Sequence, residues 1–280
     1  MARRIAFLFL ISLTFVAVVF PQGPAAGARP VIVQGAMRSE TEKLASSLEN
    51  VSVERVSGWT FWRGTIDGYP VIVSRTLKGI ANAAAATAIA VERYNPIAII
   101  NQGTAGGHEP SLHLYDIVLG NITVSLGAFR TPHRVAGAGS NPLTWEPMNL
   151  MASEGSAGND STARTVARFS GDTVLLAVAR CVARQYTRGR VVDGVIGSAD
   201  MWVDEIDLIE KYHTKYGSSV EDMETASAAQ IAGIFQVAFL GIRVVSDNTT
   251  NGDAYDRKTG EACQDFVYQV VKAYVAALRR

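Results

Sequence analysis

The chain has 280 residues, of which 48% are hydrophobic and 19% charged, and its 26 Lys and Arg residues balance 26 Asp and Glu residues. Such a chain can bury a sizeable core, and it has no basic cluster long enough to neutralise several phosphates, so we expect no nucleic-acid partner. No Cys/His spacing is typical of zinc, so we expect no metal site.

The first 28 residues are typical of a secretory signal peptide. Arg3 and Arg4 form a basic region, an apolar run follows at 5–20, and Ala26-Gly27-Ala28 is an A-x-A cleavage signal. We predict cleavage before Arg29 and export to the periplasm or the medium, with no membrane association afterwards. The alternative is an uncleaved membrane anchor, although the apolar run is near the lower limit for a spanning helix.

Residues 29–280 have the pattern of one α/β domain. Short apolar runs alternate with helical patterns, without an internal repeat or a linker. We therefore expect a three-layer αβα fold, with helices on both faces of a central mixed β-sheet. The expected strands are 30–34, 60–65, 69–75, 97–100, 115–119, 122–126, 191–196 and 237–245. The expected helices are 39–48, 79–94, 174–185, 204–212, 262–278 and one that begins within 220–229.

The first helix is expected to begin at Ser39, which matches a capping box with Glu42. Glu40 then lies in a first helical turn directly after a strand. It is either a solvated residue favoured by the helix dipole or a functional residue at the carboxyl edge of the sheet.

Two segments are expected to be loops. Segment 101–107 has three glycines among five residues, which let backbone approach a ligand or turn sharply. It lacks the lysine–serine pair of a P-loop and the full dinucleotide fingerprint, so we expect neither ATP nor NAD. Segment 130–160 is rich in Gly, Pro, Ser and Asn and is expected to be functional or mobile. In it, His133, Trp145 and Met148 either cap a pocket or pack the loop onto the domain.

Two acidic segments are expected to face one pocket. In 220–229, polar and acidic residues including Glu224 lead into a helix, whose start favours carboxylates. In 244–248, Asp247 ends a buried strand, and ligands gather at such strand ends in open α/β sheets. We interpret Glu224 as a residue that holds a sugar and Asp247 as a proton donor. The two cysteines, Cys181 and Cys263, either pair after export or remain buried thiols.

Five motifs, in order along the chain, resemble those of the 5′-methylthioadenosine/S-adenosylhomocysteine nucleosidases, within the superfamily of nucleoside phosphorylases and nucleosidases. They are Gly35-Ala36-Met37 with Glu40, Asn101 to Gly107, Ser198 to Val203, Val220 to Ala226, and Ser246-Asp247. The family versions of the middle three read Asn-Thr-Gly-Ser-Ala-Gly-Gly, Ser-Gly-Asp-Ala-Phe-Ile and Val-Glu-Met-Glu-Ala. The resemblance covers nearly all of residues 29–280.

The resemblance implies hydrolysis of an adenine N-glycosidic bond. Asp247, held by Ser246, would protonate N7 of the leaving base. Glu224 would bind the ribose hydroxyls and stabilise the oxocarbenium-like transition state, and Glu40 would activate the attacking water. The remaining substrate-binding residues are expected to be Met223 against the ribose, Thr104, Ala105 and Gly106 on the sugar side, and Trp202 and Val203 beside the base. Asp222 is a further expected substrate-binding residue. The family also implies a homodimer and no cofactor.

The chain departs from the family at three places. Thr76-Leu77-Lys78-Gly79 replaces a Gly-x-Gly, Asp222 replaces a Glu, and Arg38 stands where an acidic residue is common. Arg38 and Lys78 keep open a purine nucleoside phosphorylase, in which phosphate is the nucleophile. The chain lacks the Gly-Asp-Pro-x-Arg phosphate motif, and Glu40 would repel the anion. A non-catalytic nucleoside-binding or storage protein is a third alternative.

Overall fold

The structure is a computed structural model that describes residues 27–155 and 160–279. The predicted signal peptide therefore lies, except for its last two residues, outside the described residues. Within the described residues, no helix combines the length and the apolar character needed to cross a membrane.

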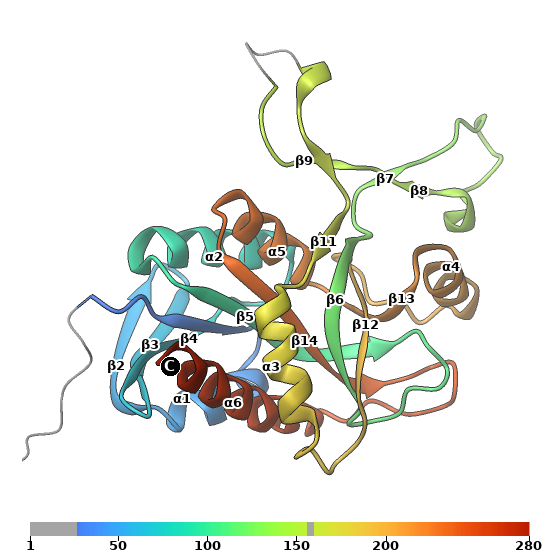
Figure 1. The fold of residues 1–280 in the computed structure, drawn as a ribbon. Helices are drawn as coiled ribbons and strands as arrows, with labels where there is room; N and C mark the ends of the chain where they lie inside the picture. The colour runs from blue at the N-terminus through green and yellow to red at the C-terminus, as the bar shows by residue number, and fades with distance from the viewer. Residues whose placement is uncertain (1–26, 156–159, 280) are drawn as a thin grey trace, which may run out of the picture.

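A ten-stranded mixed sheet forms the centre of the domain, as predicted (Figure 1). Its order is β11-β6-β12-β13-β5-β1-β4-β3-β2, and β14 pairs with both β5 and β6. The strands β5, β13, β12, β6 and β14 thus close into a ring. The strands are β1 (Val31–Gly35), β2 (Glu49–Val56), β3 (Trp59–Ile66), β4 (Tyr69–Arg75), β5 (Ala98–Gly107), β6 (Ile117–Ser125), β11 (Arg168–Ser170), β12 (Val191–Ser198), β13 (Ser218–Asp222) and β14 (Ala238–Asp247).

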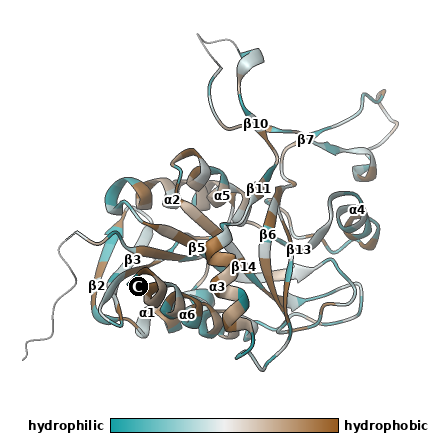
Figure 2. Ribbon diagram, viewed as in Figure 1, coloured by the Kyte–Doolittle hydropathy of each residue, from teal (hydrophilic) through white to brown (hydrophobic). Residues whose placement is uncertain are grey.

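Helices cover both faces of the sheet, which confirms the three-layer αβα fold. α1 (Glu42–Ser46), α3 (Thr173–Ala183) and α6 (Thr259–Leu278) share one apolar cluster with the sheet. α2 (Ile80–Tyr94) and α5 (Thr225–Ile234) share another, and α4 (Ile206–Tyr216) packs beside β12 and β13. The central strands are hydrophobic along most of their length, because helices bury them on both sides (Figure 2).

The described residues of segment 130–160, which are 130–155 and 160, belong to an arm that projects from the body of the domain (Figure 1). Short strands pair within it as β7 (Phe129–Arg130) with β8 (Glu146–Pro147), and β9 (Leu150–Met151) with β10 (Thr165–Val166). Trp145 packs against Phe129, with 6.0 Å between ring centroids, while His133 and Met148 are exposed. Trp145 therefore packs the arm and does not cap a pocket.

Three predictions about the elements were wrong. Segment 101–107 lies within β5, because β14 pairs with residues 101–106 and β13 pairs with the last two glycines. One strand, β6, replaces the two predicted at 115–119 and 122–126. Ser39 does not cap a helix: Arg38–Glu40 form a 3-10 turn, and α1 begins at Glu42 after Thr41.

The edge strand β2 was not predicted, because most of its residues are exposed and its pairing with β3 was not evident from the pattern.

The structure also decides the state of the two cysteines. Both are free thiols, with Cys263 buried and Cys181 exposed, so neither alternative of a disulfide or of two buried thiols holds.

Candidate active site

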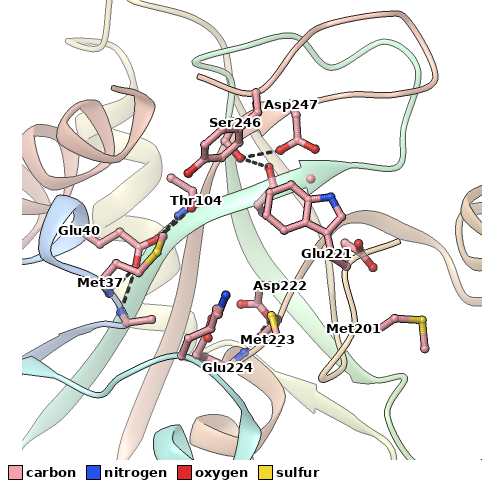
Figure 3. Close-up of a pocket in the computed structure, with 16 residues that line it drawn as sticks. Met37, Glu40, Thr104, Met201, Glu221, Asp222, Met223, Glu224, Ser246 and Asp247 are labelled. Atoms are coloured by element: carbon pink, nitrogen blue, oxygen red, sulfur yellow. Dashed lines mark hydrogen bonds between the residues drawn. The ribbon is translucent and has the colours of Figure 1, made fainter. Parts of the chain in front are cut away.

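A pocket at the carboxyl ends of β1, β5 and β14 contains ten of the eleven predicted site residues (Figure 3). They are Glu40, Thr104, Ala105, Gly106, Trp202, Asp222, Met223, Glu224, Ser246 and Asp247. The exception is Val203, which is buried behind the pocket wall in the apolar cluster beside α4. Six further residues line the pocket, namely Ala36, Met37, Lys78, Met201, Glu221 and Tyr255.

Glu40 enters the pocket from the turn after β1 and is only 3% exposed, so the interpretation as a solvated residue is wrong. Its Oε2 accepts hydrogen bonds from the amides of Ala36 (2.9 Å) and Met37 (3.0 Å). Its Oε1 accepts from the amide (2.8 Å) and hydroxyl (2.9 Å) of Thr104. A Cβ added at Gly103 would lie 2.8 Å from Oε1, so only glycine allows this close approach. The carboxylate is therefore fixed in place by four donors.

Glu224 lies immediately before α5 and points into the same pocket (Figure 3). Its Oε1 accepts a 2.9 Å hydrogen bond from the amide of Gly79, which has φ +107°. Burial and, to a lesser extent, the neighbouring Asp222 carboxylate raise the pKa of Glu224 to about 8, while Arg243 opposes the shift. The carboxyl of Glu224 is therefore far more readily protonated than that of an ordinary Glu.

Arg243 is a buried cation behind this wall of the pocket. Its Nη2 lies 2.5 Å from the Asp222 carboxylate, 4.0 Å from that of Glu224 and 2.5 Å from Oδ1 of Asn101. The Asp222 carboxylate also accepts hydrogen bonds from Ser198 and Thr225. Asp222 is thus fully engaged within the protein, and it orients the pocket wall instead of offering a free carboxylate to a ligand.

Asp247 ends β14, and its Oδ1 accepts a 2.8 Å hydrogen bond from the hydroxyl of Ser246. Burial raises the pKa of Asp247, and this hydrogen bond lowers it by a smaller amount. The Ser246 hydroxyl has one hydrogen and a second acceptor, the Ala105 carbonyl, at 3.2 Å. It can therefore turn from Asp247 to Ala105 when Asp247 is protonated, so the pair is suited to a proton-donating carboxyl.

Two aromatic residues stand at the mouth of the pocket. The rings of Trp202 and Tyr255 meet edge to face with 5.7 Å between centroids, and they are 62% and 46% exposed. Lys78 is also exposed at the mouth. Arg38, by contrast, points away from the pocket into solvent, where it pairs with Glu42 at 2.8 Å.

Sequence reasoning missed Glu221, Arg243 and Tyr255. A signal existed for Arg243, because a charged residue interrupts the apolar run 237–245 and must be paired where it is buried. Glu221 was hidden within an acidic stretch that we attributed to a helix start, whereas it lies in the strand β13. Tyr255 follows β14 in a segment without a distinctive pattern.

The arrangement suits the cleavage of a bond between a sugar and a base. Figure 3 shows Glu40 and Glu224 on one side of the pocket and Glu221 on the other, with Asp247 near Ser246 at the strand end. One carboxyl with a raised pKa can donate a proton, while two others face a neighbouring region that can hold a sugar and a water. No group of His, Cys, Asp and Glu suited to a metal ion occurs among the residues that the structure describes.

Comparisons with known proteins agree with this geometry. The sequence model of the Phosphorylase superfamily matches residues 30–276. The 5′-methylthioadenosine/S-adenosylhomocysteine nucleosidase of Tolumonas auensis is 29% identical over 214 residues, which cover 76% of this chain and 84% of that protein. The nucleosidase of the same name from Bacillus thuringiensis is 28% identical over 223 residues, which cover 78% and 85%.

Solved structures share the fold. The Neisseria meningitidis 5′-methylthioadenosine/S-adenosylhomocysteine nucleosidase, in complex with methylthio-immucillin-A, has a TM-score of 0.70 and 25% identity, and the match covers 88% of this chain and 99% of that one. The futalosine hydrolase of Helicobacter pylori has a TM-score of 0.70 at 19% identity, with 88% and 98% covered, and so shares the fold alone.

Proposed function

Because the chain belongs to the phosphorylase superfamily, we propose that it hydrolyses the N-glycosidic bond of an adenine nucleoside and releases adenine and a 5-substituted ribose. The substrate is of the 5′-methylthioadenosine or S-adenosylhomocysteine type, as the names of its relatives suggest. One observation carries the proposal: Glu40, Glu224 and Asp247 come from three separate elements and line one pocket.

Departure of the base requires an acid, because a purine is a poor leaving group as an anion. The Asp247 carboxyl, whose pKa burial raises, donates its proton to N7 as the bond breaks. Ser246 then turns its hydroxyl to the newly ionised carboxylate, 2.8 Å away, and stabilises it.

The ribose develops positive charge as the base leaves. Glu224, in its ionised form, binds the sugar hydroxyls and stabilises the growing cation. Nη2 of Arg243 lies 4.0 Å from the Glu224 carboxylate, and its positive charge balances the negative charge of that carboxylate inside the protein. Glu40, fixed by its backbone donors, holds and deprotonates the attacking water.

Phosphate as the nucleophile is the second candidate, since Lys78 lines the pocket as a cation. The other cation considered for this role, Arg38, has a side chain that is 76% exposed and paired with Glu42. Water is therefore the favoured nucleophile. A non-catalytic binding protein would not need three carboxyl groups in catalytic positions, which argues against the third alternative.

The test is adenine release from purified residues 29–280 with 5′-methylthioadenosine, in the presence and absence of phosphate. Adenine and free methylthioribose at rates indifferent to phosphate are expected. Release that requires phosphate and yields a sugar 1-phosphate would instead identify a phosphorylase. If no base is released from this or any other nucleoside, the non-catalytic binding protein is the alternative that remains.

We also propose that residues 1–28 direct export and that the mature protein is a homodimer. Support for export is the charge and hydropathy pattern of the N-terminus, and support for the dimer is the family resemblance. N-terminal sequencing of the protein recovered from the periplasm or medium should begin at Arg29. Sedimentation analysis of that protein should give twice the mass of one chain.

A further inference from the structure

Glu221 is a carboxylate at the base side of the pocket that the proposed chemistry does not use. It lies in β13, is 8% exposed, and lines the pocket together with Asp247. Both side chains flank the same backbone position: a Cβ built at Gly106 would lie 3.4 Å from Oδ2 of Asp247 and 3.7 Å from Cγ of Glu221. A ligand that takes a proton from Asp247 therefore also faces Glu221.

Hydrogen bonds within the protein fix the direction of this carboxylate. Its Oε1 accepts a 2.7 Å hydrogen bond from the amide of Val203. Its Oε2 lies 3.4 Å from Nε2 of His108, and this buried ring nitrogen has no hydrogen-bond partner among the described residues. The family resemblance implies that Val203 lies beside the base. Here its amide contacts Glu221 instead.

The amide of Val203 fixes how Oε1 of Glu221 can be used. Because this N–H donates to Oε1, the oxygen acts as a hydrogen-bond acceptor, and a carboxylate oxygen has a further lone pair that can accept from a ligand. His108 is held beside Glu221 by Ser218, whose hydroxyl oxygen lies 3.1 Å from Nδ1 and 2.9 Å from the Val220 carbonyl oxygen. Glu221 therefore offers an acceptor oxygen in the pocket.

A donor at Asp247 and an acceptor at Glu221 match the edge of a 6-aminopurine that carries N7 and the 6-amino group. Along this edge a 6-aminopurine presents an acceptor at N7 and a donor at its amino group, whereas a 6-oxopurine presents two acceptors. We propose that Glu221 is a specificity-determining residue, which accepts a hydrogen bond from the 6-amino group and rejects 6-oxopurine nucleosides. This inference rests on the proposed function for the identity of the ligand as a purine nucleoside.

The test compares kcat/KM for 5′-methylthioadenosine and 5′-methylthioinosine in the wild-type chain, in Glu221→Gln and in the control Glu205→Gln. Glutamine keeps the size of Glu221 and adds a donor that suits a 6-oxo group. The preference for the 6-amino substrate should fall by about 10- to 100-fold, because one buried hydrogen bond to the substrate is exchanged for a mismatch. The control removes a carboxylate that is exposed beside α4 and should keep the wild-type preference.

Binding of free adenine and free hypoxanthine, measured by calorimetry on the same three proteins, separates this inference from the proposed function. Adenine selectivity that depends on Glu221, in a protein that releases no base from any nucleoside, would support the inference and defeat the proposed function. An unchanged preference in Glu221→Gln with normal hydrolysis would overturn the inference alone. A wild-type preference for the 6-oxo substrate or base would also overturn it.

Discussion

The guanidinium of Arg243 lies 2.5 Å from the carboxylate of Asp222, and the two side chains are 2% and 1% exposed. The pair joins β14 to the end of β13, directly behind the pocket. Removal of one member leaves the other charge buried without its partner, which is far more costly than the loss of a surface pair.

Arg243→Met should therefore lower the free energy of unfolding by about 3–5 kcal/mol, because the Asp222 carboxylate loses its cation. Urea denaturation measures this change. Arg180→Met is the matched control, since Arg180 forms an exposed pair with Asp193 at 2.5 Å and its loss should have a far smaller effect. Equal effects of the two substitutions would show that the buried pair does not stabilise the fold.

Glu224 should make stability depend on pH. Its pKa is about 8 in the folded protein, against 4.5 for an unperturbed Glu. Between these two values the folded state holds a proton that the unfolded state has released, so the contribution of Glu224 to stability is greatest below pH 4.5 and falls as the pH rises toward 8. The expected slope from this residue is at most about 1.4 kcal/mol per pH unit.

Glu224→Gln removes the titrating group and keeps the shape of the side chain. The free energy of unfolding of this variant should fall less steeply than that of the wild type over the same pH range. Urea denaturation at several pH values provides the comparison. Parallel curves for the two proteins would mean that Glu224 is already ionised in the folded state.

Asp247→Asn should lower kcat by about 10²- to 10⁴-fold, because an amide cannot donate a proton to the leaving base as an acid does. Its stability should remain close to that of the wild type, since Asn can still accept from Ser246. Asp265→Asn is the control, because Asp265 is an exposed residue of α6 paired with Lys43. Near-normal turnover in Asp247→Asn would remove Asp247 from the role of acid.

Ser246→Ala should move the basic limb of the pH–rate profile to higher pH. The hydrogen bond from Ser246 lowers the pKa of Asp247, so its loss leaves the carboxyl protonated over a wider range. The rate on the plateau should fall, because the carboxylate produced by proton transfer loses its donor. A limb displaced to lower pH would contradict this account of the pair.

The two cysteines should differ in reactivity. Cys181 is exposed on α3, whereas Cys263 is buried in α6, where burial raises its pKa to about 12. The native protein should react with one equivalent of a thiol reagent, and the denatured protein with two. A Cys181→Ser variant should show no reaction until it is unfolded.

Much of the site could be predicted from the sequence because its motifs are local. Glu40, Glu224 and Asp247 each lie next to a turn, a helix start or a strand end, and short stretches of sequence encode these features. The three-layer fold was predictable for the same reason, since the alternation of apolar runs and helical patterns is visible along the chain. The prediction that Ser39 caps a helix was wrong, because a 3-10 turn forms there instead and buries Glu40, whose carboxylate accepts a hydrogen bond from Thr104.

What the tertiary structure alone decided is how the buried charges pair. Glu221 receives its partners from Val203 and His108, and Asp222 receives Arg243, all of them distant in the sequence. The partners of a buried carboxylate and the direction in which it points depend on which strands are neighbours in the sheet. A single sequence does not contain that information. Local patterns could place carboxylates at the pocket, whereas only the packing of β13 between β5 and β12 places Glu221 beside Asp247 in it.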